Sequence, residues 1–299
     1  MLADNRVADY LRPDLWRSHS DRQVYLSSLL SHPLGGGPAA TAAAFVPDLH
    51  HFKGSFGAKE TIPLYRDRDA TVPNLAPGLL DLLSETYARE VTAESFLAYA
   101  FGVLAHPRFT DTYSAELETR ELRVPITKDA NLFEKVRALG ARVVCMHTYG
   151  EGFVPNGKQR GRVPQGSARC TKAVPDRPDS YPERFYFVEE SNTLRVGEGE
   201  FAPASREVFE FEVSGLKVVQ SWLKYRMKQG AGKKSSPLDD IRPERWTSQF
   251  TTELLEMLWV LEATVAGYPE QAALLNAVVE GECFLASELK RVPEELRKP

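Results

Sequence analysis

Five lysines are spaced so that they could form a phosphate-binding surface. At roughly 100° per residue, the first three fall on one half of a helix expected from Leu216, and the last two lie in the loop behind it. These lysines are Lys217, Lys224, Lys228, Lys233 and Lys234. Such a stripe is typical of surfaces that meet nucleic-acid phosphates. The same pattern also fits a solvated helix face, and the spacing alone does not decide between the two.

Arg226 falls on the opposite, apolar half of the same expected helix. This half contains Leu216, Val219, Trp222, Leu223 and Tyr225. An unpaired guanidinium there would be costly, so Arg226 must pair with a carboxylate, extend to solvent or reach a ligand.

A second basic stretch is the long irregular segment at residues 152–180. Between Phe153 and Pro175 it holds five basic residues and no acidic one: Lys158, Arg160, Arg162, Arg169 and Lys172. Long loops in compact proteins are often functional. A basic, glycine-containing loop can follow a phosphate backbone while its arginines approach base edges. A tolerated surface insertion explains the segment equally well.

Short strands are expected to position these basic residues. Residues 209–213 (FEFEV) alternate apolar and acidic side chains, which predicts a half-buried strand before a Ser214–Gly215 turn. Residues 185–188 and 193–196 predict two strands joined by a turn. We also expect a buried strand at residues 141–149, after a helix that Gly140 ends.

Helices are expected on both sides of this region. The apolar spacing predicts a helix that begins near Thr92 and is stopped by His106–Pro107. A second is expected over residues 250–265, ended by Gly267, with a further helix from Pro269. Residues 1–75 show glycines and turn residues and are expected to be irregular. The predicted fold class is α+β, with a helical N-terminal half packed with a mixed β recognition region and a C-terminal helical bundle.

The predicted organisation has three consecutive regions. Residues 1–140 form a helical and irregular region, residues 141–236 a mixed β recognition core, and residues 237–299 the C-terminal helices. The chain has 299 residues, a formal net charge of −4 and three widely spaced cysteines. This composition excludes an overall basic field and a disulfide framework. No apolar run approaches the roughly 20 residues of a membrane span, so we expect a cytoplasmic protein.

Enzymatic signals are weak. The segment GAGKKSS is not a phosphate loop, because Lys234 follows Gly-Lys where Ser or Thr is needed and Met227 occupies the position of the first glycine. No Asn-Pro-Pro-Tyr methyltransferase motif occurs. Asp48, His50 and His51 could suggest a metal site, but neighbouring histidines in a strand point to opposite faces. His147 could act as an acid or base, although a structural role is favoured. We predict no catalytic residue and no metal ligand.

The segment V-S-G-L-K-V-V-Q-S-W-L-K-Y-R, followed by a helix rich in Thr, Glu and Leu, resembles the C-terminal specificity domain of type ISP restriction-modification enzymes. These single-chain enzymes are related to adenine-N6 DNA methyltransferases. FLAYAFGVLAHPRFTDTYSAEL with LRVPIT, and PDLHHFKGSFGAKETIPLYRD, are also similar to segments of that family. The similarity spans about residues 5–265, and W-L-K-x-R is its most specific element. Because the family pattern places Trp222 and Arg226 in one strand, turn and helix unit, we interpret Trp222 as the anchor of the helix to the core and Arg226 as a structural pairing residue.

The resemblance implies that the chain recognises a short sequence in double-stranded DNA as part of a restriction-modification or phage-defence system. The methyltransferase, ATPase and nuclease parts of the family are missing, so a methyltransferase or restriction partner chain is implied, or the chain is a piece of a longer enzyme. S-adenosylmethionine would act only through that methyltransferase. The alternative is a protein-interaction subunit that docks on a separate methyltransferase without reading DNA itself.

Overall fold

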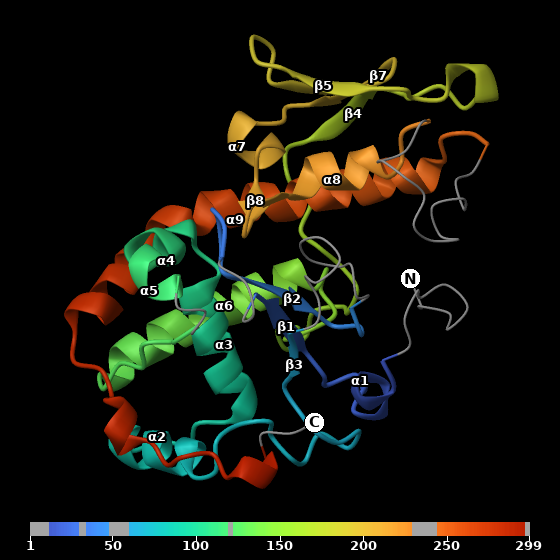
Figure 1. Ribbon diagram of the computed structural model, residues 1–299. Coiled ribbons are helices and arrows are strands. Elements are labelled where there is room, and N and C mark those ends of the chain that lie inside the picture. Colours follow the sequence, from blue (N-terminus) through green and yellow to red (C-terminus); the bar gives the residue numbers. More distant parts are fainter. Residues whose placement is uncertain (1–11, 30–33, 48–59, 119–121, 229–243, 297–299) are drawn as a thin grey trace. The chain divides into compact units, whose positions relative to one another are not determined.

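The chain forms two compact units in the computed structural model (Figure 1), which describes residues 12–29, 34–47, 60–118, 122–228 and 244–296. The sheet unit comprises Val163–Gly267, and the helical unit comprises Arg12–Arg162 with Tyr268–Pro299. These two units differ from the three consecutive regions that were expected from the sequence. The division into three regions stays a prediction. Helices and antiparallel sheets occur together, so the α+β fold class is confirmed.

The helical unit combines a small sheet with most of the helices. Its antiparallel sheet has the strand order β2–β1–β3. The strands are β1 (Tyr25–Ser28), β2 (Ala40–Ala43) and β3 (Thr61–Pro63). The helices are α1 (Pro13–Arg17), α2 (Leu79–Tyr87), α3 (Ala93–Leu104), α4 (Pro107–Thr112), α5 (Ser114–Leu117) and α6 (Ala130–His147). Two 3₁₀ helices follow near the C-terminus, Ala286–Glu288 and Glu294–Leu296. The expectation that residues 1–75 are irregular is therefore wrong, since three strands lie there.

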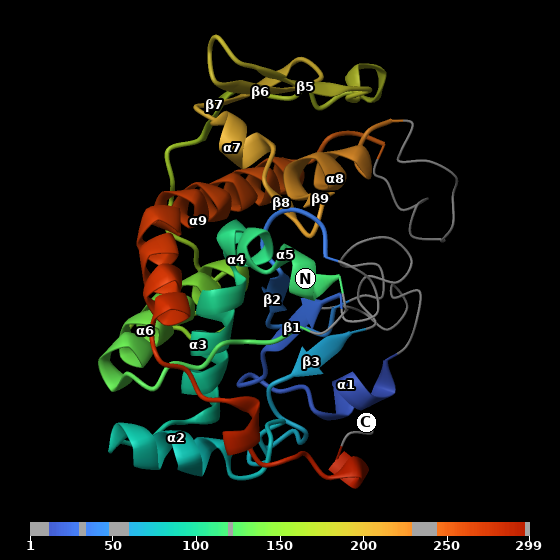
Figure 2. The same ribbon diagram turned by 60° about the vertical axis from the view of Figure 1, so that its left-hand side comes forward.

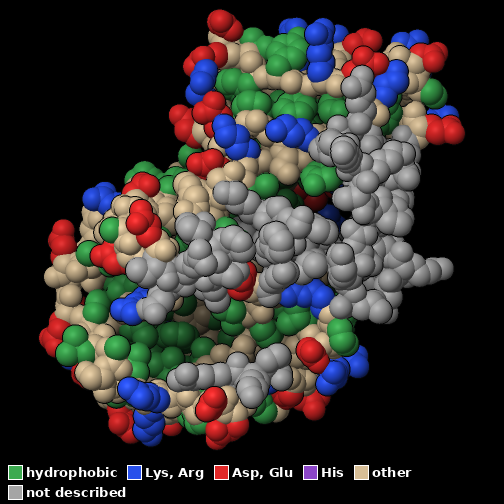
Figure 3. All heavy atoms as spheres, in the orientation of Figure 1, with side chains coloured by type: hydrophobic (Ala, Val, Ile, Leu, Met, Phe, Trp, Pro, Cys, Tyr) green, Lys and Arg blue, Asp and Glu red, His purple; other side chains and the backbone are tan. Residues whose placement is uncertain are grey.

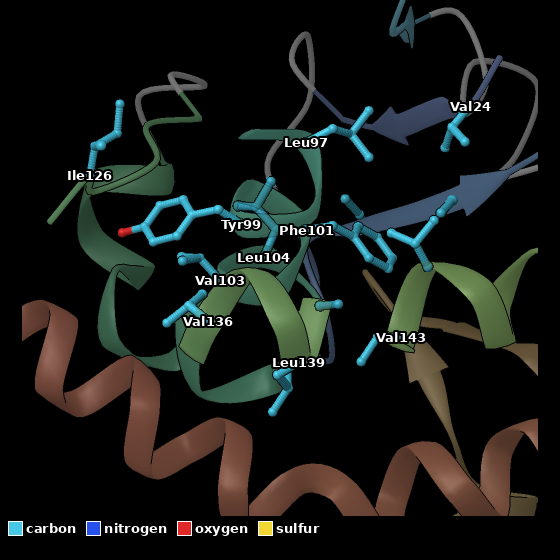
Figure 4. Packing of buried hydrophobic residues seen from close by; sticks show 14 of the residues in the cluster. Val24, Leu97, Tyr99, Phe101, Val103, Leu104, Ile126, Val136, Leu139 and Val143 are labelled. Atoms are coloured by element: carbon cyan, nitrogen blue, oxygen red, sulfur yellow. The ribbon is translucent and has the colours of Figure 1, made fainter. Parts of the chain in front are cut away.

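The core of the helical unit lies between α3 and α6 (Figure 4). The Tyr99 and Phe133 rings stack with their centroids 4.6 Å apart. The helices approach closely at Gly140, where an added Cβ would lie 2.8 Å from the backbone carbon of Ala98 and 2.9 Å from the backbone nitrogen of Gly102. Gly140 therefore serves close helix packing inside α6.

This close packing explains why the strand expected at residues 141–149 is wrong. The Asp129 carboxylate caps α6 by accepting the backbone N–H groups of Asn131 and Leu132, and the helix continues from Ala130 through Gly140 to His147. A glycine after an apolar run is a common helix end, but it also allows two helix backbones to meet. Here the contact with α3 decides the outcome.

The sheet unit is built on a four-stranded antiparallel sheet in the order β4–β7–β6–β5. Its strands are β4 (Arg169–Lys172), β5 (Phe185–Val188), β6 (Thr193–Val196) and β7 (Gly199–Ala202). A 3₁₀ helix (Pro178–Ser180), the two-residue strands β8 (Glu212–Val213) and β9 (Leu216–Lys217), and the helices α7 (Arg206–Phe209) and α8 (Val218–Lys224) complete it. The strands expected at residues 185–188 and 193–196 are confirmed.

One face of this sheet is covered, and the other is open. The Phe187 and Phe209 rings stack with their centroids 5.4 Å apart, which places α7 against the inner face. Phe187 pairs with Leu194, and Leu194 pairs with Phe201 on the next strand. Leu194 and Phe201 are fully buried on this same face. Figures 1 and 2 show α7, α8 and α9 on this side of the sheet, and no other element of the described part of this unit on the opposite side.

Two local expectations in this unit need correction. Residues 209–213 do not form one strand, because Ser205 caps α7 by accepting the Val208 N–H and this helix continues to Phe209. Only Glu212–Val213 is extended. α8 begins at Val218, so Leu216 belongs to β9 and precedes the helix.

The long helix α9 (Ser248–Glu280) contributes its first part to the sheet unit and its last part to the helical unit. The expected break at Gly267 and Pro269 is wrong, since Pro269 lies inside the helix. Gln271 donates to the Gly102 carbonyl at 2.9 Å, and Tyr268 packs edge-on against His106. These tertiary contacts hold the part of α9 around Pro269. Within the described residues, no helix is long and apolar enough to cross a membrane.

Candidate nucleic-acid interface

A row of polar side chains crosses all four strands on the open face of the β4–β7 sheet. The strand register pairs Tyr186 with Arg195, Arg195 with Glu200, and Glu200 with Lys172. Directly paired residues of antiparallel strands project to the same face, so these four side chains share the face opposite Phe187. We call this surface the outer face. In Figure 3, Lys and Arg side chains alternate with hydrophobic and acidic ones over this unit.

An irregularity in β4 brings a second basic residue to the outer face. Arg169 pairs with Ala202, and Lys172 pairs with Glu200. Lys172 follows Arg169 by three positions, whereas Ala202 follows Glu200 by only two. Such a bulge inserts one extra residue and so returns the chain to the same face. Without it, Arg169 and Lys172 would project to opposite faces.

Arg195 is the most highly connected member of the outer face. Its Nη1 donates to the Tyr186 hydroxyl at 3.2 Å, and its Nη2 lies 3.1 Å from Oε1 of Glu200. These contacts raise the pKa of Arg195, with the hydrogen bond to Tyr186 as the main cause. The guanidinium is therefore held in one orientation between two cross-strand neighbours.

The segment that leads into β4 is anchored to α9. The Glu262 carboxylate accepts from the backbone N–H of Ser167 at 2.7 Å and of Ala168 at 3.0 Å, and Trp259 Nε1 donates to the Ala168 carbonyl at 2.9 Å. Nη1 of Arg169 donates to the carbonyls of Gly166 and Ala168 at 2.6 Å and 2.7 Å. Arg169 is thus partly engaged by its own loop, and only some of its donors remain for a ligand.

The predicted basic loop is divided between the two units. Lys158, Arg160 and Arg162 belong to the helical unit, whereas Arg169 and Lys172 belong to the sheet unit. Arg160 pairs with acidic residues of its own unit: Nε lies 2.7 Å from Glu151, and Nη1 lies 3.3 Å from Asp21. Lys158 and Arg162 are exposed and make no ion pair with the described residues. The five residues of the predicted basic loop therefore belong to two different compact units.

The lysine stripe is only partly helical. Lys224 ends α8, Lys217 precedes it in β9, and Lys228 lies beyond its end, where its backbone N–H donates to the Pro182 carbonyl at 2.9 Å. All three are exposed. Lys228 Nζ pairs with Glu183 at 2.9 Å, and this ion pair lowers the pKa of Glu183. The expectation that one continuous helix carries all three is wrong, and Lys233 and Lys234 lie outside the described residues.

The interpretation of Arg226 and Trp222 as structural residues agrees with the geometry. The Arg226 guanidinium lies 3.7 Å from the Trp222 ring centroid and 5.1 Å from that of Phe250, and Nη2 lies 3.4 Å from Glu253. Burial lowers the pKa of Arg226, and Glu253 opposes that effect. Tyr225, expected on the apolar half, is 54% exposed.

Of the histidine candidates, the structure describes only His147. His147 lies near the end of α6 with its ring 5.6 Å from that of Phe101, and burial lowers its pKa to about 4. Asp48, His50 and His51 lie outside the described residues. Within the residues that are described, no three His, Cys, Asp or Glu side chains are grouped to hold a metal ion.

Comparison with known families identifies the chain. The family model described as the Type ISP C-terminal specificity domain matches residues 1–257. The chain belongs to this family. A comparison with curated protein sequences finds no match.

Solved structures share the fold of this specificity domain. The DrdV–DNA complex matches with a TM-score of 0.55 and 16% identity, over 87% of the domain and 25% of that chain. A nuclease-deletion mutant of the Type ISP restriction-modification enzyme LlaGI, in complex with a DNA substrate mimic, matches with a TM-score of 0.51 and 14% identity, over 88% of the domain and 21% of that chain. The ATP-dependent Type ISP enzyme LlaBIII bound to DNA matches with a TM-score of 0.57 and 15% identity, over 88% of the domain and 16% of that chain. The domain thus spans a quarter or less of these chains.

Tyr186, Arg195 and Glu200 of this specificity domain are not among the site residues predicted from the sequence. The strands at residues 185–188 and 193–196 were expected, and period-2 alternation places Tyr186 opposite Phe185 and Phe187. That alternation was the available signal for an outward-facing tyrosine and arginine. It could not show that the two residues pair, because pairing depends on strand register.

Proposed function

We propose that this domain recognises a target sequence in duplex DNA and positions the catalytic parts of a restriction-modification enzyme on it. The observation that carries the proposal is membership of the Type ISP C-terminal specificity domain family over residues 1–257. The three similar structures are, by their descriptions, DNA complexes. The outer face supplies suitable chemistry, because cationic side chains bind phosphates and arginine forks match base edges.

The methyltransferase and nuclease activities belong to other polypeptide segments in this proposal. The domain corresponds to a quarter or less of the similar chains, so such parts would be supplied by a separate partner chain or by the rest of a longer enzyme. S-adenosylmethionine would bind there, and this domain would need no cofactor of its own.

The lysines around α8 are proposed phosphate contacts. Lys217 and Lys224 are exposed and make no ion pair with the described residues, whereas Glu183 already neutralises Lys228. Phosphate contacts weaken binding to all duplexes alike when they are lost, and each contributes to the salt dependence of affinity. Lys158, Arg162 and Lys172 are also exposed and are proposed to contribute in the same way.

The test measures the affinity of the chain for labelled duplex DNA over a range of salt concentrations. The double variant Lys224→Glu/Lys228→Glu should bind every duplex more weakly, with a smaller dependence of log affinity on log salt. Of the two single variants, Lys224→Glu should have the larger effect, because Lys228 is paired with Glu183. Unchanged affinity and salt dependence in the double variant would contradict the assignment of these lysines.

The same measurement distinguishes the alternative of a protein-interaction subunit. Adding a purified Type ISP methyltransferase segment provides the second arm. Binding of the isolated chain to duplex DNA supports direct recognition. Binding only when the methyltransferase segment is present would favour a subunit that docks on its partner without reading DNA.

A further inference from the structure

We propose that Arg195 reads a base edge of the bound duplex, with Tyr186 and Glu200 as the positioning residues that orient its guanidinium. The inference rests on the proposed function and assigns sequence discrimination to one side chain of the outer face. It separates this role from the phosphate contacts of the lysines.

The position of Arg195 suits a ligand contact. It lies on β6, an inner strand of the sheet, on the face opposite the buried Leu194 and Phe201. Its side chain is 43% exposed. In both ribbon views, no element of the described part of the sheet unit covers this side of the sheet (Figures 1 and 2).

Cross-strand contacts hold the guanidinium in place while leaving donors available. One Nη group bonds to the Tyr186 hydroxyl, and the other pairs with Glu200. Each Nη carries two hydrogens, so each retains one donor that these contacts do not use. The Tyr186 ring centroid lies 5.9 Å from Cζ of Arg195, which further limits the rotation of the side chain. A preorientated fork loses less conformational entropy when it binds.

The charge balance favours a base edge over a phosphate. The Glu200 carboxylate, 3.1 Å from Nη2, neutralises Arg195 and would repel a phosphate placed beside it. A neutral pair contributes little to counterion release, which is the source of non-specific affinity. Its directional donors still match the O6 and N7 acceptors of guanine, which arginine contacts most often in specific complexes. Lys172, next in the same row, has no such orienting donor contact among the described residues and suits a phosphate.

In this row of paired residues, Arg195 is therefore assigned to a base edge and Lys172 to a phosphate. An exposed ion pair on a sheet stabilises the fold only slightly. Orientation of the arginine is the larger consequence of the Tyr186–Arg195–Glu200 contacts. The alternative, a purely structural cross-strand pair, makes a different prediction for DNA selection.

The experiment uses the 299-residue chain and a pool of duplexes with randomised central base pairs, from which bound sequences are selected and counted. Arg195→Lys keeps the charge but loses the fork. We expect it to reduce the preference at one base-pair position by about tenfold or more, with the salt dependence of binding unchanged. Lys172→Gln is the matched control from the same row. It should weaken binding to all sequences, reduce the salt slope by about one, and leave the base preferences intact.

A second variant keeps the inference testable if the first is poorly folded. Tyr186→Phe removes only the hydroxyl that accepts from Arg195, and it should weaken the preference at the same base-pair position. Thermal unfolding of each variant establishes that it is folded. An Arg195→Lys variant that selects the same sequences as the wild type would overturn this inference alone. A wild-type chain that binds no duplex would overturn the proposed function, and this inference with it.

Discussion

The Glu262 carboxylate accepts two hydrogen bonds from Ser167, one from its backbone N–H at 2.7 Å and one from its hydroxyl at 2.8 Å. A residue of α9 thereby holds a segment that lies 95 positions earlier in the chain. The anchored segment leads directly into β4, so the same contact positions Arg169 and Lys172. Glu262 is therefore a structural hydrogen-bond acceptor on α9.

Replacing Glu262 by glutamine should destabilise the sheet unit. Glutamine keeps the size of the side chain. In the wild type both carboxylate oxygens accept backbone N–H groups, whereas the NH₂ of glutamine is a donor and cannot accept one of them. Hydrogen bonds to charged groups contribute about 1.5–3 kcal/mol each, so we expect a loss of about 1–3 kcal/mol in the free energy of unfolding, measured by urea denaturation. Glu256→Gln on the same helix is the control and should change stability by less than about 0.5 kcal/mol. Equal denaturation midpoints for the two variants would show that the anchor is dispensable.

Two glycines of the sheet unit should respond to alanine in opposite directions. A Cβ at Gly166 would approach the Glu262 carboxylate and lie 2.8 Å from Cδ1 of Trp259, so Gly166→Ala must displace the anchor. We expect it to cost about 1–3 kcal/mol, as overpacking does. At Gly267 in α9, a Cβ would meet nothing within 4 Å among the described residues. Gly267→Ala should therefore stabilise the helix by up to about 1 kcal/mol. Thermal unfolding of both variants checks this, and a stabilising Gly166→Ala would contradict the close packing.

Removing Glu253 should leave Arg226 without its carboxylate partner. The side chains of Arg226 and Glu253 are only 24% and 27% exposed, so little water is available to replace the lost contact. We expect Glu253→Ala to cost about 1–2 kcal/mol in urea denaturation. Adding Arg226→Met should recover part of that loss, because the double variant no longer contains an unpaired buried charge. Strictly additive losses in the double variant would rule out the proposed pairing.

Acidification should weaken the helical unit through His106. Its Nδ1 accepts the Arg108 backbone N–H at 2.9 Å as the cap of α4, and burial is the main cause that lowers its pKa. A histidine whose folded-state pKa is lowered contributes full stability above the unfolded value of about 6.5 and loses it as the pH falls below that value. His147, with its pKa lowered to about 4, should act in the same direction down to that pH.

The variant His106→Asn isolates the contribution of His106. Asparagine is a good helix cap that does not titrate in this range. The fall in the urea midpoint between pH 7 and pH 5 should therefore be smaller in the variant than in the wild type. An identical fall in both proteins would assign the acid sensitivity to other groups.

The features that the sequence predicted well depend on neighbouring residues. Thr92 caps α3 by accepting the Ser95 N–H, as expected from its place before an apolar run. The strands at residues 185–188 and 193–196 follow local alternation, and they occur at those positions. The wrong predictions involve residues whose partners are distant. Gly140 and Pro269 are common helix ends, but α3 packs against Gly140 and holds the helix beyond Pro269.

The sequence by itself determined the family resemblance, the α+β class and the presence of basic side chains. Composition is read directly from the chain, and periodicity and motifs depend only on residues that are near one another in sequence. Only the tertiary structure decided which of those side chains share a surface. Strand register brings Tyr186, Arg195 and Lys172 into one row, a bulge turns Arg169 to the same face, and Arg162 belongs to the other unit. The physical reason is that register and bulges are fixed by pairing between distant segments, which no local pattern specifies.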